Sequence, residues 1–184
     1  MNKHTTHYGF VARSLHWLIA VLIVAMLIMG LDPNLIGIHR PLGIVILILA
    51  LIRIVVRLKN NTPPLPHVIP SWQRLAALLS HLSLYALMAT MPLAGWSMLS
   101  AEGYPIVLLG SLHLTPIAPH EIHLYLILRK AHMYLALLLS GTLLMHVSAA
   151  LFDGLIRRDG LFSHMARGGE AANVDRSKRR PWTT

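Results

Sequence analysis

The stretch AHMYLALLLSGTLLMHVSAALF, residues 131–152, decides the fold. Its 22 residues carry no charge and are enough to cross a bilayer as one helix. It holds two histidines, His132 and His146, fourteen positions apart. At about 100° and 1.5 Å per residue, this spacing places both side chains within roughly 40° of one direction and about 21 Å apart along the axis. The stretch predicts a membrane helix with two imidazoles on one face, at two depths.

The composition of the whole chain also indicates a membrane protein. Of 184 residues, 55% are hydrophobic and 12% are charged, and the mean hydropathy is +0.59. The net charge of +9 would suit a nucleic-acid partner in a soluble protein. However, 13 of the 16 Lys and Arg residues lie at the N-terminus, between the second and third apolar runs, or after the fourth. This positive-inside pattern predicts a lipid bilayer and no nucleic acid as the partner.

Four apolar runs predict an all-α fold, an integral membrane four-helix bundle. We expect helices at residues 13–31, 39–58, 72–100 and 129–152, with Pro41 in the first turn of the second. A short interfacial helix is expected at residues 122–128. The first run lacks a cleavage site and is expected to be retained. The predicted domains are a cytoplasmic N-terminus at 1–12, a transmembrane domain at 13–157 and a basic cytoplasmic tail at 158–184.

The orientation of the helices assigns a depth to each histidine. Four spans put both termini on one side, and the Lys and Arg count places that side in the cytoplasm. His16 and His146 then lie at the cytoplasmic end, and His39 and His132 at the outer end. A haem with two imidazole ligands needs histidines at one depth on facing helices. The sequence predicts two haems b, held by His39 with His132 and by His16 with His146.

Cysteine is absent, which excludes disulfides, thiolate ligands, c-type haem attachment and cysteine-bound iron–sulfur clusters.

His81 competes with His16 as a ligand of the inner haem. Its alternative roles are quinone binding, hydrogen bonding or packing. Loop histidines are usually solvated, so we do not expect a surface metal site at His113, His120 and His123.

Other residues have two interpretations. Gly43 and Gly141 either let a flat macrocycle approach the backbone or pack helix against helix. Arg53 and Arg57 either neutralise the propionates of an inner haem or extend to the headgroups, and Arg40 has the same two roles at the outer end.

The ordered motifs resemble those of the bacterial cytochrome b561 family, which includes the cytochrome b subunits of nickel hydrogenases. The matching pieces are SLHWL at 14–18, HRPLG at 39–43, RLKNNTPPLP at 57–66, HLSLYALM at 81–88, MPLAGW at 91–96 and the two histidines of the fourth helix. The resemblance covers about residues 8–165 and implies a four-helix bundle with two haems b. It also implies the ligand roles of His16, His39, His132 and His146. The first outer loop is shorter than in many relatives, and Arg-Pro follows His39 where relatives often have Lys-Ser.

The leading functional hypothesis is an oxidoreductase that transfers electrons across the membrane, to or from quinone. Some members of the family oxidise superoxide and reduce ubiquinone, and Arg40, Arg129 and Lys130 would favour a small anion at the outer haem. One alternative is a haem-bearing anchor subunit for a dehydrogenase or hydrogenase, with a redox partner on the outer face. A histidine-rich metal transporter is disfavoured because the spans contain no carboxylate.

Overall fold

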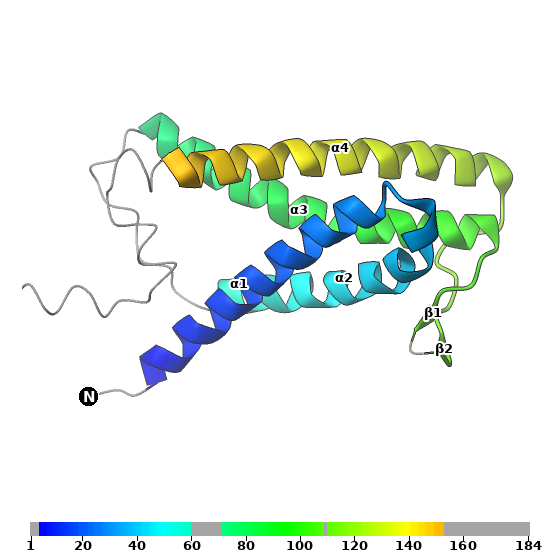
Figure 1. Cartoon of the computed structure of the whole chain (residues 1–184), viewed down its shortest axis with the longest axis horizontal. Coiled ribbons are helices and arrows are strands. Elements are labelled where there is room, and N and C mark those ends of the chain that lie inside the picture. The colour runs from blue at the N-terminus through cyan, green and yellow to red at the C-terminus, as the bar shows by residue number, and fades with distance from the viewer. Residues whose placement is uncertain (1–3, 60–70, 109, 153–184) are drawn as a thin grey trace, which may run out of the picture.

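The computed structural model describes residues 4–59, 71–108 and 110–152. Within this part, four long helices are joined by a 3-10 turn and a two-stranded hairpin (Figure 1). The elements are α1 His4–Met29, η1 Pro33–Leu35, α2 Ile36–Lys59, α3 Ser71–Glu102, β1 Val107–Leu108, β2 Leu112–His113 and α4 Ile122–Phe152. Each long helix contains a window long and apolar enough to span a bilayer. The prediction of a helical membrane bundle is therefore confirmed.

The helices begin earlier than the apolar runs predicted. α1 starts at His4, so residues 4–12 are helical, and α4 starts at Ile122. The expected interfacial helix at 122–128 is therefore the first part of α4, because no proline or glycine interrupts the chain there. α2 starts at Ile36, which places Pro41 beyond the first turn and leaves one helix hydrogen bond unmade. The predicted tail at 158–184 and the proline-rich linker at 60–70 lie outside the described residues.

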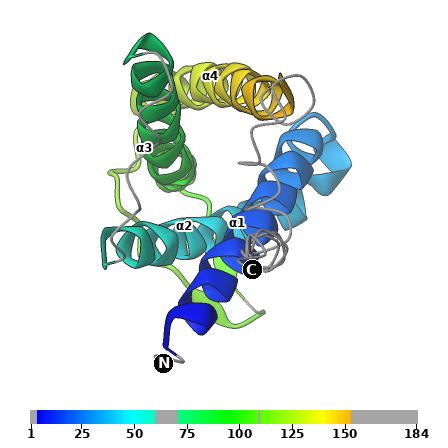
Figure 2. The same ribbon diagram turned by 90° about the vertical axis from the view of Figure 1, so that its left-hand side faces the viewer.

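Neighbouring helices in the sequence are neighbours in space. α3 and α4 pack most extensively, and α1 with α2 and α2 with α3 are the other closely packed pairs. The turn between α1 and α2 is short because Asp32 caps η1, where its Oδ1 accepts a hydrogen bond of 2.9 Å from the Asn34 amide. Viewed along the bundle, α2 and α4 lie on opposite sides, with α3 between them on one flank (Figure 2).

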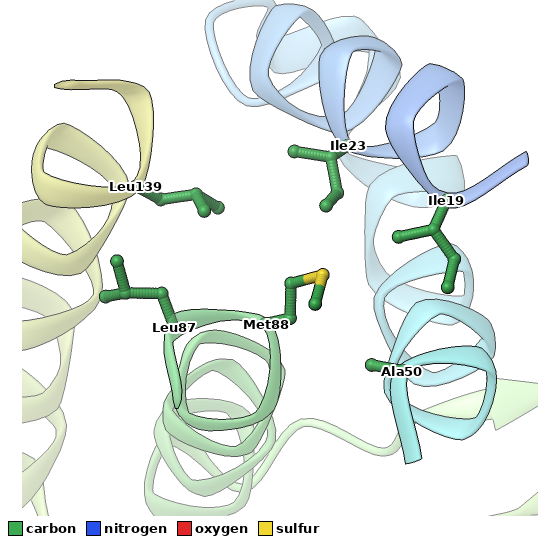
Figure 3. Packing of buried hydrophobic residues seen from close by; sticks show 6 residues of the cluster. All are labelled: Ile19, Ile23, Ala50, Leu87, Met88 and Leu139. Carbon is green, nitrogen blue, oxygen red and sulfur yellow. The ribbon is translucent and has the colours of Figure 1, made fainter. Parts of the chain in front are cut away.

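One apolar cluster joins all four helices at mid-height (Figure 3). Its members are Ile19 and Ile23 of α1, Ala50 of α2, Leu87 and Met88 of α3, and Leu139 of α4. Leu139 is the only buried residue of α4, whose other apolar side chains face outward to a large extent. Lipid accepts such side chains without the penalty that water would impose. The buried interior is thus a small apolar cluster midway along the helices, and the histidines lie toward the two ends of the bundle.

A second cluster ties the outer hairpin to the bundle. Ile44, Leu99 and Ile106 are its buried members, and Leu108 and Leu114 pack against them. The hairpin, which the sequence did not reveal, pairs Val107 with His113 and Leu108 with Leu112.

The position of Ala50 gives a test of the packing. This residue is 0% exposed within the central cluster, so we expect Ala50→Leu to overpack it and lower the free energy of unfolding by about 1–3 kcal/mol. The measurement is thermal unfolding of the purified protein in detergent. Ala86→Leu, at an exposed position on α3, is the matched control and should leave the melting temperature near that of the wild type. Equal melting temperatures for the two variants would contradict the packing described.

Candidate functional site

The outer end of the bundle brings His39 of α2 and His132 of α4 together. Their ring centroids are 6.3 Å apart, and the ring planes meet at 75°. α2 and α4 lie on opposite sides of the bundle (Figure 2) and are not a closely packed pair. The contact between the two rings therefore crosses the interior. Two imidazoles that bind one metal from opposite sides, by bonds of about 2 Å, have ring centres roughly 6 Å apart. The observed spacing is compatible with this arrangement.

In each ring of this pair, one nitrogen is buried without a hydrogen bond. The Nδ1 atoms of His39 and His132 are buried and have no hydrogen bond within the described part of the chain. An unpaired buried polar atom costs about 1–3 kcal/mol, so such atoms usually have a functional reason. Imidazole nitrogens are common metal ligands and are the axial ligands of many haems. The two residues therefore fit the axial ligation of haem iron.

A glycine lies against each of these two rings. A Cβ atom added to Gly95 of α3 would come within 3.1 Å of Cε1 of His132, closer than an ordinary contact. A Cβ at Gly30, just after α1, would lie 3.5 Å from Cε1 of His39. The missing side chains allow the backbone to approach both imidazoles closely. The contact of Gly95 with His132 is the tighter of the two.

The two glycines singled out from the sequence have other surroundings. A Cβ at Gly43 would meet the methyl group of Met26 at 3.6 Å, and a Cβ at Gly141 would meet nothing within 4 Å. Gly95 could have been found from the sequence, since it lies in the MPLAGW motif, but its contact with His132 depends on how α3 packs on α4.

At the inner end, His146 of α4 packs against His81 of α3. Their ring centroids are 5.1 Å apart, with 78° between the planes. The His81 Nδ1–H donates a hydrogen bond of 2.7 Å to the carbonyl of Ala77, because a carbonyl can only accept. In the neutral ring, Nε2 of His81 then carries a free lone pair. The hydroxyl of Ser80 lies 3.3 Å from Nδ1 of His146.

His16 joins this inner cluster through Arg53. An Nη atom of Arg53 donates to Nδ1 of His16 over 3.0 Å, and the other Nη donates to the Ala12 carbonyl over 3.4 Å. His16 lies close enough to His146 and His81 to interact with both electrostatically. The structure thus brings His16, His81 and His146 to one end of the bundle, and the ring in direct contact with His146 is that of His81.

The remaining candidates lie at the ends of the helices. Arg57, Arg129 and Lys130 are exposed, and the guanidinium of Arg40 covers the ring of Tyr104 at 4.2 Å. No group of three His, Asp or Glu side chains suited to a metal ion occurs in the part of the chain that the structure describes. His113 of β2, His120 of the loop before α4 and His123 of α4 are all exposed.

A membrane bundle with imidazoles facing one another near both ends is characteristic of membrane cytochromes b. The family model described as prokaryotic cytochrome b561 matches residues 7–168. The chain therefore belongs to the prokaryotic cytochrome b561 family, and its four apolar helices mark it as a multi-pass bacterial membrane protein, in a family that binds haem b.

Two proteins of Escherichia coli (strain K12) are similar to this chain. Cytochrome b561 homolog 2 is 31% identical over 118 residues, which cover 56% of this chain and 61% of the relative. Cytochrome b561 homolog 1 is 25% identical over 162 residues, which cover 82% of this chain and 92% of the relative. The matched part of the chain thus spans less than two thirds of the first relative and nearly all of the second.

The contact between Gly95 and His132 gives a second prediction. We expect Gly95→Ala to push the His132 ring from its position and lower the haem content of the purified protein, because the added Cβ would be only 3.1 Å from Cε1. Gly141→Ala, where the space is open, should keep the full haem content. Haem is measured as the pyridine haemochrome per chain. Equal haem contents and equal reduced-minus-oxidised spectra in both variants would contradict the role of Gly95.

Proposed function

We propose that the chain carries electrons across a bacterial inner membrane through two haems b, one near each face. The observation that carries this proposal is the pair of half-buried, facing imidazoles of His39 and His132, whose buried Nδ1 atoms have no partner among the described residues. The proposed ligands are these two residues for the outer haem and His16 with His146 for the inner one. We further propose that both termini lie in the cytoplasm, with the domain boundaries at residues 12 and 157.

A haem held by the imidazoles of these residues would supply a carrier for one electron at a time. The residues of the chain would position this haem and determine the polarity around it. α2 and α4 hold the outer imidazoles from opposite sides, and Gly95 fixes how far the His132 ring can turn toward α3. The apolar cluster at mid-height keeps water out of the region between the two ends.

Charge at the inner end supports a site for an anionic group. Arg53 is partly buried in its membrane-spanning helix, where a cation needs a partner. The carboxylates of the described residues are Asp32, Glu102 and Glu121, all near the outer ends of the helices. A haem propionate at the inner end would therefore pair with Arg53, which already holds His16.

His81 is the second candidate partner of His146. Its ring lies against that of His146, and its Nδ1–H is fixed on the Ala77 carbonyl, which leaves Nε2 free to bind a metal. The hydrogen bond from Arg53 to His16 places the proton of the neutral His16 ring on Nε2. The resemblance favours His16, and the contact geometry favours His81.

The proposed acceptor of the electrons is a quinone in the bilayer. A more specific candidate activity is oxidation of superoxide on the outer face with reduction of ubiquinone. Arg40, Arg129 and Lys130 at that face would draw a small anion toward the outer haem. The alternative function, a haem-bearing anchor for a separate dehydrogenase or hydrogenase, uses the same two haems and differs in requiring a protein partner on the outer face.

Replacement of single histidines tests the proposal and the ligand pairs. The purified wild type should contain two haems b per chain. His39→Ala and His132→Ala should each remove the same outer haem, and His146→Ala should remove the other one. His123→Ala, at an exposed position on α4, is the control and should keep both. The readouts are haem content and a reduced-minus-oxidised spectrum; retention of both haems in His132→Ala would overturn the outer assignment.

The same experiment decides between the inner partners. We expect His16→Ala to lose the inner haem and His81→Ala to retain it with a shifted midpoint potential, since His81 contacts the His146 ring. Loss of the inner haem in His81→Ala together with its retention in His16→Ala would replace His16 by His81 as the ligand.

A further inference from the structure

Two adjacent residues of α3 contact the ring of His146. The hydroxyl of Ser80 lies 3.3 Å from Nδ1 of His146. The ring of His81 meets the His146 ring edge-on, with 5.1 Å between the centroids. These contacts arise because α3 and α4 are the most extensively packed helices in the described part of the chain. His146 is a proposed ligand of the inner haem whether its partner is His16 or His81.

The hydroxyl of Ser80 differs in direction from other hydroxyls of α3 and α4. A serine or threonine within a helix can donate to the carbonyl four residues earlier. Four described side chains do so, over 2.8–2.9 Å: Thr90, Ser100, Ser140 and Thr142. The hydroxyl of Ser80 instead reaches across to α4. Serine and histidine side chains in membrane bundles form hydrogen bonds of this kind between helices.

The contact between Ser80 and His146 is compatible with two tautomers of the ring. If the hydroxyl donates, Nδ1 is the acceptor, and the proton of the neutral ring is on Nε2. If the hydroxyl accepts, the proton is on Nδ1, and Nε2 keeps a lone pair for a metal. Only the second tautomer allows His146 to bind iron through Nε2. His81, whose Nδ1–H donates to the Ala77 carbonyl, has this tautomer in its neutral form.

His16 shows why the type of partner matters. An Nη atom of Arg53 donates to Nδ1 of His16 over 3.0 Å. A guanidinium can only donate, so this contact places the proton of the neutral His16 ring on Nε2. A hydroxyl can also accept, so the contact of His146 with Ser80 leaves Nε2 available.

We propose that Ser80 is a positioning residue for the inner haem and acts through His146. Its oxygen accepts the Nδ1–H of His146, which fixes the tautomer with a free Nε2 and makes the imidazole a stronger electron donor to the iron. This proposal rests on the proposed function, since it requires a haem held by His146. The bond is longer than the usual N–H···O distance of about 2.9–3.0 Å, so we expect a moderate effect on the iron.

The test is a redox titration of the full-length, haem-loaded protein, followed by its absorption spectrum. The inner haem is identified as the one that His146→Ala removes. Ser80→Ala deletes the acceptor and makes the imidazole a weaker donor, which favours reduced iron. At a fixed potential, we expect the ratio of reduced to oxidised inner haem to rise about threefold or more. The outer haem should titrate as in the wild type.

Two variants of equal shape separate the hydroxyl from packing. Ser80→Thr keeps a hydroxyl, and Ser80→Val has a methyl group in its place. The valine variant should shift the inner haem as Ser80→Ala does, and the threonine variant should restore the titration of the wild type. Ser83→Ala, at an exposed position on the same helix, is the control and should change neither haem. Equal titrations of the inner haem in the threonine and valine variants would overturn the positioning role.

Haem content separates this proposal from the proposed function. Loss of the inner haem from Ser80→Ala and Ser80→Val, with retention in Ser80→Thr, would support the role of the hydroxyl. Loss from all three variants would assign Ser80 to packing alone and overturn the proposal. Full haem content in His146→Ala would overturn the ligand assignment and this proposal together. If His146→Ala loses one haem but every Ser80 variant titrates as the wild type does, this proposal alone is overturned.

Discussion

The arrangement of the bundle centres on two imidazoles that meet from opposite helices, each with one ring nitrogen left unpaired. His39 and His132 meet at 6.3 Å between ring centroids, and their Nδ1 atoms are unpaired within the described residues. Buried polar atoms without a partner are costly, and we propose that a bound group offsets this free-energy cost. Haem b, which the family of this chain binds, offers this bond through its iron. The rings can meet because α2 lies opposite α4 and because Gly95, which has no side chain, lies against the His132 ring.

This constraint also accounts for the thin apolar core. A soluble four-helix bundle stabilises itself by burying a wide stripe of each helix, whereas α4 buries only Leu139. Lipid covers the outward side chains, and the central cluster occupies only the middle of the bundle. The histidines and Arg53 lie away from that cluster, where polar groups and cofactors are accommodated between facing helices. The apolar residues that stabilise the bundle and the candidate cofactor ligands thus lie at different depths.

Much of this arrangement could be predicted from the sequence. The uncharged runs set the four helices, and the direction of each helix set the depth of its histidines, which placed His39 and His132 at the same end. Depth alone could not choose between His16 and His81, because both lie at the inner end and the choice depends on rotation about each helix axis. The contact of Gly95 with His132 was missed because it depends on the packing of α3 against α4. The packing of the loop before α4 on the outer end of α3 depends on hydrogen bonds to Ser100 and Ala101, for which apolar periodicity gives no signal.

The central claim is that paired imidazoles occupy both axial positions of every haem in this protein. Electron paramagnetic resonance of the oxidised protein, combined with addition of carbon monoxide after reduction, tests it most directly. We expect all ferric haem to be low-spin and carbon monoxide to leave the reduced spectrum unchanged, since two imidazoles would leave no axial position open. A high-spin ferric signal in the intact protein, or a spectral change of the reduced protein with carbon monoxide, would contradict it.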